Sequence, residues 1–211
     1  MSNRPRRRAA ALATTVATLA TLATACASSP SPGAVASSAR ALESPEARFP
    51  LLVLAESTTQ LVALTASASD SARVQVRVAS ITSNSLDLTR DYVGRARASV
   101  LRAGSGAEQA ITQGDLIGIR YAYAKSTLHG ERDLEIRGPG YDHYWQLGRA
   151  KLELARTQTG QAVVVADSAL ACRAATCASS RAKEMATYID AAAGATREAE
   201  GLVRIALLRL Q

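Results

Sequence analysis

Apolar residues recur every three or four positions through residues 44–211, and this period limits the folds that the chain can adopt. A repeat of 3.6 residues places such positions on one side of an α-helix. Aromatic residues make up only 4% of the chain and alanine is abundant, so we expect the helices to pack through small side chains. The sequence therefore predicts an all-α fold, an Ala-rich antiparallel bundle of four to five helices. The clearest apolar face lies near the C-terminus, at Met185, Tyr188, Ile189, Ala192, Ala199, Leu202, Val203, Ala206, Leu207 and Leu210.

Local signals indicate where the first helices begin and end. Pro50 suits the first position of a helix whose apolar face starts at the next residue. Gly104 suits the end of a second helix, whose apolar face runs over residues 74–100. Ser105 and Glu108 have the spacing of a capping box, in which each side chain accepts a hydrogen bond from the backbone of the other. This pattern predicts that a third helix begins at Ser105.

Two further helices are expected in the C-terminal part of the chain. The Gly-Pro-Gly run at residues 138–140 is typical of a loop. A fourth apolar face begins after it at Tyr141 and extends toward Ala166. Either Ser179 or Ser180 can cap the start of the last helix.

An α+β fold with a short antiparallel sheet is the alternative. Residues 74–78 and 117–123 alternate apolar and other side chains, and residues 152–165 have the pattern of a hairpin. The abundance of alanine and the lack of an Asn-Gly or Asp-Gly turn favour helices instead.

The first 25 residues have the parts of an export signal. Residues 9–25 carry no charge, and their threonines make them less apolar than the roughly 20-residue span of a stable transmembrane helix. We therefore expect residues 1–25 to be a cleaved signal peptide. The basic segment before them, which the positive-inside bias holds in the cytoplasm, contains Arg4, Arg6, Arg7 and Arg8.

The end of this segment, residues 22–26 with the sequence Leu-Ala-Thr-Ala-Cys, resembles the lipobox of bacterial lipoproteins. The resemblance implies that Cys26 becomes the first mature residue and is acylated on its sulfur. It also implies an outer-membrane location facing the periplasm, because Ala27 rather than aspartate follows the cysteine. Residues 23–25 equally fit the A-x-A rule of ordinary secretory cleavage, whose product would be a soluble periplasmic protein.

The next segment, residues 26–43, is rich in serine, proline and alanine. Such a composition buries too little apolar surface to offset the entropy of ordering, so we expect a flexible, disordered tether. About 17 flexible residues have a root-mean-square reach of roughly 20 to 25 Å. The tether therefore separates the helical domain, residues 44–211, from the membrane.

The charge of the mature chain argues against a nucleic-acid partner. The whole chain carries a formal charge of +7, and loss of the four arginines of the signal leaves +3. Acidic and basic residues also alternate along the sequence, which is typical of a solvated surface rather than a phosphate-binding stripe.

Two cysteines remain for a disulfide once Cys26 carries lipid, and exported proteins retain disulfides. Cys172 and Cys177 are five residues apart, which on a continuous helix separates their Cα atoms by about 8.6 Å. A disulfide tolerates roughly 7 Å, so a bond between them requires the chain to turn. The alternative is two reduced thiols on one helix.

Few residues support catalysis or metal binding. Neither His129 nor His143 has a second histidine one turn away, and the carboxylates near His129 are typical of solvated loop charges. The chain has no Gly-x-Ser-x-Gly elbow and no phosphate-binding glycine motif. We predict a protein that is not an enzyme and that needs neither a cofactor nor a metal.

One group of aromatic residues flanks the expected loop at residues 138–140. Exposed tyrosine and tryptophan side chains give large, rigid contact area for a partner. If they are buried, they instead fill one end of an Ala-lined core. The candidate partner-binding residues are Tyr121, Tyr123, Tyr141, Tyr144 and Trp145.

These features favour a membrane-anchored, non-catalytic envelope lipoprotein that binds an envelope protein as an accessory or assembly factor. A periplasmic inhibitor or immunity lipoprotein is a second hypothesis, for which a protruding loop around residues 138–144 is expected. An envelope-polymer hydrolase is a third, and its carboxylates would be sought among Asp133, Glu135 and Asp142.

Overall fold

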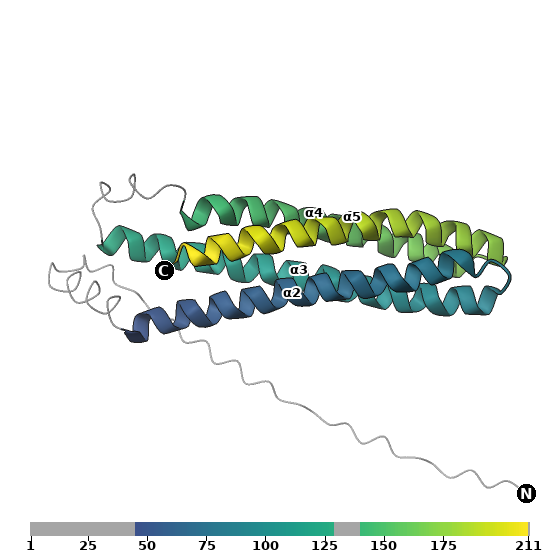
Figure 1. The fold of residues 1–211 in the computed structure, drawn as a ribbon, viewed down its shortest axis with the longest axis horizontal. Helices are drawn as coiled ribbons and strands as arrows, with labels where there is room; N and C mark the ends of the chain where they lie inside the picture. Colours follow the sequence, from purple (N-terminus) through teal and green to yellow (C-terminus); the bar gives the residue numbers. More distant parts are fainter. Residues whose placement is uncertain (1–44, 129–139, 211) are drawn as a thin grey trace, which may run out of the picture.

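The computed structural model describes residues 45–128 and 140–210, with side chains described for residues 51–122 and 140–210. These residues form four long helices (Figure 1): α2 at Pro45–Ile81, α3 at Leu86–Leu128, α4 at Tyr141–Ala171 and α5 at Ala175–Leu208. At 1.5 Å per residue, the 43 residues of α3 extend about 65 Å. The predicted all-α bundle is confirmed. The α+β alternative is wrong, because no strand occurs in the described part of the chain and the alternating segments there are helical.

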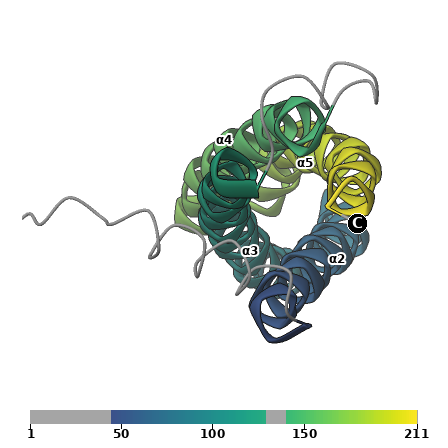
Figure 2. The same ribbon diagram turned by 90° about the vertical axis from the view of Figure 1, so that its left-hand side faces the viewer.

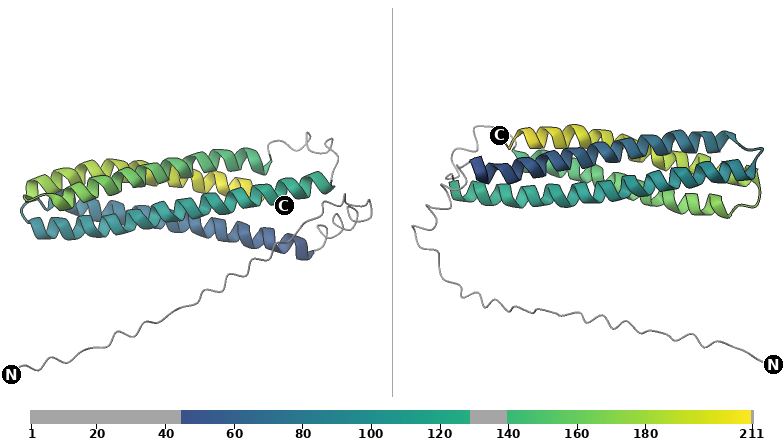
Figure 3. Two further views of the ribbon diagram at one scale, coloured as in Figure 1. Left: turned by 180° about the vertical axis from the view of Figure 1, so that it is seen from behind. Right: turned by 90° about the horizontal axis from the view of Figure 1, so that it is seen from below.

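The four helices run up and down around a common axis. Helices that are consecutive in the chain pack against each other, and α2 also packs against α5, so the bundle closes on itself (Figure 2). The α2–α3 and α4–α5 connections lie at one end, which we call the tip. The start of α2 and the end of α5 lie at the other end, which we call the base (Figure 3). The predicted signal peptide, Cys26 and the predicted tether fall outside the described residues.

Small side chains fill most of the core, as the composition predicts. The core of the tip half is mainly alanine and valine, whereas the core of the base half also holds the large rings of Tyr141 and Trp145. Buried residues of the tip half include Ala72, Val76, Val93, Ala96, Val100, Ala162, Ala166, Ala169, Ala182, Met185 and Ile189, and those of the base half include Val62, Ala107, Ala110, Ile117, Leu152, Ala199, Val203 and Ala206.

Helix α2 lines this core with one face. Its segment Leu51–Ile81 is long and apolar enough to cross a membrane by length and composition alone. In the bundle its buried positions recur every three or four residues, which is the pattern of a helix with one face against a protein core. The buried Thr58 and Thr65 donate their hydroxyl protons to carbonyl oxygens one turn earlier, both at 2.8 Å, so neither hydroxyl is left unpaired.

Two glycines allow neighbouring helices to approach closely. Gly106 of α3 faces Thr65 of α2, and a Cβ added to Gly106 would lie 2.5 Å from the Thr65 hydroxyl oxygen. Gly114, two turns further along α3, faces Trp145 of α4, and an added Cβ would overlap the six-membered part of the indole ring. Only glycine fits at these two positions without a shift of the facing side chain.

The predicted helix end at Gly104 and helix start at Ser105 are wrong, because α3 runs unbroken through both residues. A Cβ added to Gly104 would lie 3.0 Å from the hydroxyl oxygen of Thr159 in α4, so this glycine also serves helix packing. The contacts on both sides of α3 outweigh the roughly 1 kcal/mol that glycine costs in a helix interior.

The chain turns instead at residues 82–85, and the predicted face over residues 74–100 is split between two helices. The Ser85 hydroxyl accepts a hydrogen bond from the backbone N–H of Leu88 at 3.4 Å and so caps α3. The buried Thr89 hydroxyl lies 2.6 Å from the carbonyl oxygen of Thr82 and closes the turn. The first helix also begins earlier than predicted, because Pro45 rather than Pro50 takes its first position.

The prediction for the cysteine pair is confirmed. Cys172 and Cys177 form a disulfide with Cα atoms 5.8 Å apart, and the chain turns between them. The backbone carbonyl of Cys172 accepts a hydrogen bond from Arg90 of α3 at 2.7 Å, which ties the two connections of the tip together. Helix α5 begins at Ala175, so Ser179 and Ser180 lie inside it and the predicted serine cap is wrong.

Ion pairs on the surface join neighbouring helices. Asp190 of α5 accepts from Arg73 of α2 at 2.6 Å, and Asp70 of α2 pairs with Arg197 of α5 at 2.6 Å. Similar pairs connect α3 with α4 and α4 with α5. Exposed pairs of this kind contribute little stability each. They do show which residues of adjacent helices lie at the same level along the bundle.

Two glycine substitutions test the close approach of α3 and α4. We expect Gly114→Ala to lower the free energy of unfolding by about 1 to 3 kcal/mol, because the new methyl group overlaps the Trp145 ring. Gly160→Ala is the matched control: its methyl group meets nothing within 4 Å and removes glycine from a helix, so we expect a gain of about 0.5 to 1 kcal/mol. Urea unfolding followed by circular dichroism measures both. Equal effects of the two substitutions would contradict the packing described.

Candidate functional site

The aromatic residues singled out in the sequence include two that lie in the core of the base, Tyr141 and Trp145. Tyr141 is 0% exposed and Trp145 is 2% exposed. Tyr121 and Tyr144 are half-buried and pack at the edge of the same cluster. The side chain of Tyr123 lies outside the described residues. Burial therefore removes Tyr141 and Trp145 from any exposed partner-binding surface.

Polar contacts hold the two buried rings in place between α3 and α4. The Trp145 indole N–H donates to the Asp115 carboxylate at 2.8 Å, and the Arg149 guanidinium donates to both oxygens of that carboxylate at 3.1 Å. The Tyr141 hydroxyl donates to the backbone carbonyl of Gly114 at 2.8 Å. These groups join α3 to α4 and satisfy each other's hydrogen bonds, which is a structural role.

Burial also changes the acidity of the Tyr141 phenol. Loss of hydration raises its pKa well above the ordinary value, and the nearby carboxylates of Asp142 and Asp115 raise the pKa further. The hydroxyl therefore keeps its proton and stays a hydrogen-bond donor.

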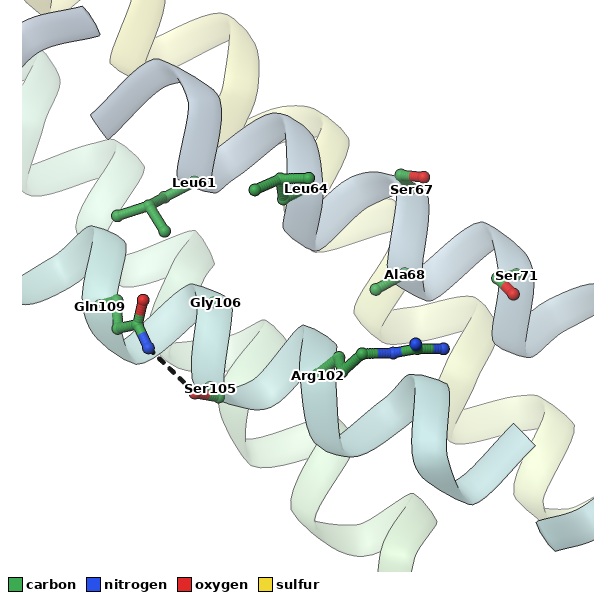
Figure 4. A pocket seen from close by; sticks show the side chains of 9 residues that line it. All are labelled: Leu61, Leu64, Ser67, Ala68, Ser71, Arg102, Ser105, Gly106 and Gln109. Atoms are coloured by element: carbon green, nitrogen blue, oxygen red, sulfur yellow. Dashed lines mark hydrogen bonds between the residues drawn. The ribbon is translucent and has the colours of Figure 1, made fainter. Parts of the chain in front are cut away.

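A groove between α2 and α3 is the stronger candidate for a binding site (Figure 4). It has a volume of about 500 Å³ and is open to solvent. Its α2 wall is largely apolar and its α3 wall is largely polar, so it offers two kinds of contact side by side. The lining residues are Leu61, Leu64, Ser67, Ala68 and Ser71 of α2, and Arg102, Ser105, Gly106 and Gln109 of α3.

The groove exists because α3 carries small residues at its middle. Gly106 has no side chain and lies against Thr65 of α2, so the two helices meet closely beneath the groove. Ser105, next to it, fills little space, and its hydroxyl accepts a hydrogen bond from the Gln109 amide at 3.3 Å. Larger side chains at these two positions would fill the groove.

Two lining side chains give the groove its chemical character. Leu64 of α2 is 64% exposed and offers an apolar surface on the α2 side of the groove. Arg102 of α3 is exposed and donates to the hydroxyl of Ser99 at 3.0 Å. Among the described residues no carboxylate lies within ion-pair distance of Arg102. The groove therefore suits apolar groups accompanied by an anionic one.

The residues considered for catalysis or metal binding do not converge in the part of the chain that the structure describes. His143 and Asp142 are exposed on the first turn of α4, and the His143 ring contacts only the edge of Tyr144 among aromatic rings. His129, Asp133 and Glu135 lie outside the described residues. Within residues 45–128 and 140–210, no three histidine, cysteine, aspartate or glutamate side chains gather as a metal site would require.

The sequence contained a signal for the groove that its interpretation missed. Gly104-Ser105-Gly106 interrupts a helical pattern, and such a run indicates either a helix boundary or a close contact between helices.

Comparison of the chain with protein-family models, curated proteins and solved structures finds no match. Function therefore has to be inferred from the residues and geometry of this chain.

The buried Tyr141 phenol makes the free energy of unfolding decrease as the pH rises into the alkaline range. We expect Tyr141→Phe to lower the free energy of unfolding at neutral pH by about 1 kcal/mol, because the bond to the Gly114 carbonyl is lost. The unfolded chain ionises Tyr141 near its ordinary pKa of about 10, whereas the folded protein keeps the proton. The unfolded state thus binds fewer protons above this pH, so the parent protein loses stability as the pH rises.

The phenylalanine variant lacks this ionisation, and we expect the stability difference between the two proteins to shrink between about pH 8 and about pH 11. Urea titrations of both proteins across this range measure it. A difference that stays constant with pH would contradict the burial of the phenol.

Proposed function

We propose that the protein is a lipid-anchored envelope protein that acts without catalysis, by binding another protein through the α2–α3 groove. Its location would be the periplasmic face of the outer membrane, and its role that of an accessory or assembly factor. The observation that carries the proposal is that the exposed Leu64 side chain and the Arg102 guanidinium line opposite walls of one groove.

The chemistry of the groove supports one kind of partner. A helix or extended segment with apolar side chains would cover Leu61, Leu64 and Ala68 on the α2 side. A carboxylate on the same segment would pair with Arg102, which has no such partner among the described residues. A groove walled by two long helices is already formed before binding, so little ordering entropy opposes association.

The position of the groove is compatible with a membrane anchor. Leu61 and Ser71 lie 16 and 26 residues after Pro45, the first residue of α2. At 1.5 Å per residue the groove stands roughly 24 to 39 Å from the base. A chain anchored at Cys26 would therefore present the groove well clear of the lipid headgroups.

The anchor is tested by cell fractionation. We expect the parent protein to sediment with membranes and Cys26→Ser to move to the soluble periplasmic fraction, because the acyl chains supply most of the membrane affinity. Mass spectrometry of the mature N-terminus is the companion measurement, and it should show an acylated Cys26. A membrane fraction that is unchanged by Cys26→Ser, with an unmodified N-terminus, would refute the anchor.

Binding through the groove is tested by crosslinking in cells. A photo-crosslinking residue at Leu64 should give one discrete adduct with an envelope protein, and the same residue at the exposed Gln161 of α4 should give none. We expect Arg102→Glu to weaken the Leu64 adduct about tenfold or more, since it reverses the charge that faces the partner. Adducts of equal yield at both positions, or an adduct indifferent to Arg102→Glu, would count against the groove.

A further inference from the structure

Exposed large apolar side chains gather around the base of the bundle. All four helices contribute to this group, which we call the base ring. Its members are 38% to 69% exposed. They are Leu52 and Val53 of α2, Leu116 and Ile119 of α3, Leu147 of α4, and Ile205 and Leu208 of α5.

Contacts between helices show that these residues share one level. Ser71 meets Ser99 and Gly106 faces Thr65, so positions of α2 and α3 whose numbers sum to about 170 lie side by side. Ile119 is therefore level with Leu52.

The same reasoning places α4 and α5 at this level. Gly114 faces Trp145, and Gly148 faces Val203, which brings Leu147 and the last two turns of α5 beside residues 110–116 of α3. The base ring therefore occupies only about 15 Å of the bundle's length.

The first residue of α2 lies at this same end of the bundle. Helix α2 begins at the base, and the proposed lipid site at Cys26 precedes its first residue by only 19 positions. Exposed apolar residues also lie in the tip half, at Val74, Ile81, Leu88, Leu101 and Val164, but the start of α2 and the end of α5 both lie at the base (Figure 3). An anchored chain holds the base, and not the tip, beside the bilayer.

Charge at the base adds a smaller contribution. The guanidiniums of Arg120, Arg204 and Arg209 are exposed on the same turns as the base ring, together with the carboxylates of Glu56 and Asp142. Three positive groups against two negative ones leave one net positive charge. Apolar contact, rather than attraction to anionic lipid, would therefore contribute most of the affinity.

We infer that the base ring is a membrane-contacting surface, which enters the interfacial layer of the lipid bilayer. This inference rests on the proposed anchoring of the chain at Cys26. Stable attachment of peripheral proteins needs more than one weak signal, and the base ring supplies a second signal besides the acyl chains.

The test uses the mature chain, residues 26–211, with Cys26→Ser, so that no acyl chain contributes. Binding is measured by flotation with vesicles of phosphatidylethanolamine and phosphatidylglycerol. We expect measurable binding, and we expect the pair Ile119→Ser with Leu208→Ser to reduce it about tenfold or more. The matched control is Val74→Ser with Ile81→Ser at the tip, whose side chains are as exposed, and it should change binding less than about twofold.

A second measurement reports contact directly. The chain has one tryptophan, and Trp145 is buried, so a tryptophan placed at the surface reports on its own surroundings. Brominated lipids should quench Ile119→Trp and leave Ile81→Trp unquenched. Equal quenching at the two positions would overturn the inference.

Two further outcomes would also overturn it. One is the absence of vesicle binding by the unacylated chain. The other is a base ring that holds two copies of the chain together, seen as dissociation of a dimer by the Ile119→Ser and Leu208→Ser pair with unchanged vesicle binding. Because the vesicle assay omits the acyl group, its failure is distinct from a failure of the Cys26 fractionation experiment.

Discussion

The Trp145 ring fits over Gly114, and the rest of the base depends on this contact. Glycine leaves the space that the indole occupies, and Asp115, the next residue of α3, accepts a hydrogen bond from the indole N–H at 2.8 Å. Tyr141, one turn earlier on α4, stacks on the same ring with centroids 6.1 Å apart. Helices α3 and α4 are thereby fixed against each other by a large ring on α4 that fits over a residue without a side chain on α3.

The same device, used between α2 and α3, produces the candidate binding site. Gly106 allows Thr65 to come close, so the two helices meet below the surface and leave a groove above. The close packing of α2 on α3 and the groove above it thus both depend on Gly106. The groove is formed by two helices of a closed bundle, whereas two of the candidate residues chosen from the sequence, Tyr141 and Trp145, are buried in the core.

The period of the apolar residues was enough to predict the fold class, because a repeat of 3.6 residues over long segments has few other solutions. The disulfide turn also followed from the spacing of Cys172 and Cys177. The helix ends did not, because glycine has two uses: at Gly104 it relieves a contact with Thr159 rather than ending a helix. Likewise, the groove joins Leu64 to Arg102, 38 positions apart in the chain, and no local pattern records that neighbours on different helices will meet.

The contact between Gly114 and Trp145 is tested most directly by a double-mutant cycle, in which Gly114→Ala is measured in the parent protein and in Trp145→Phe. Phenylalanine lacks the part of the indole that an added Cβ would overlap. The account predicts that Gly114→Ala costs about 2 kcal/mol less in the Trp145→Phe background than in the parent protein. Additive effects, within about 0.5 kcal/mol, would show that the two residues do not meet and would contradict the packing on which the base of the bundle depends.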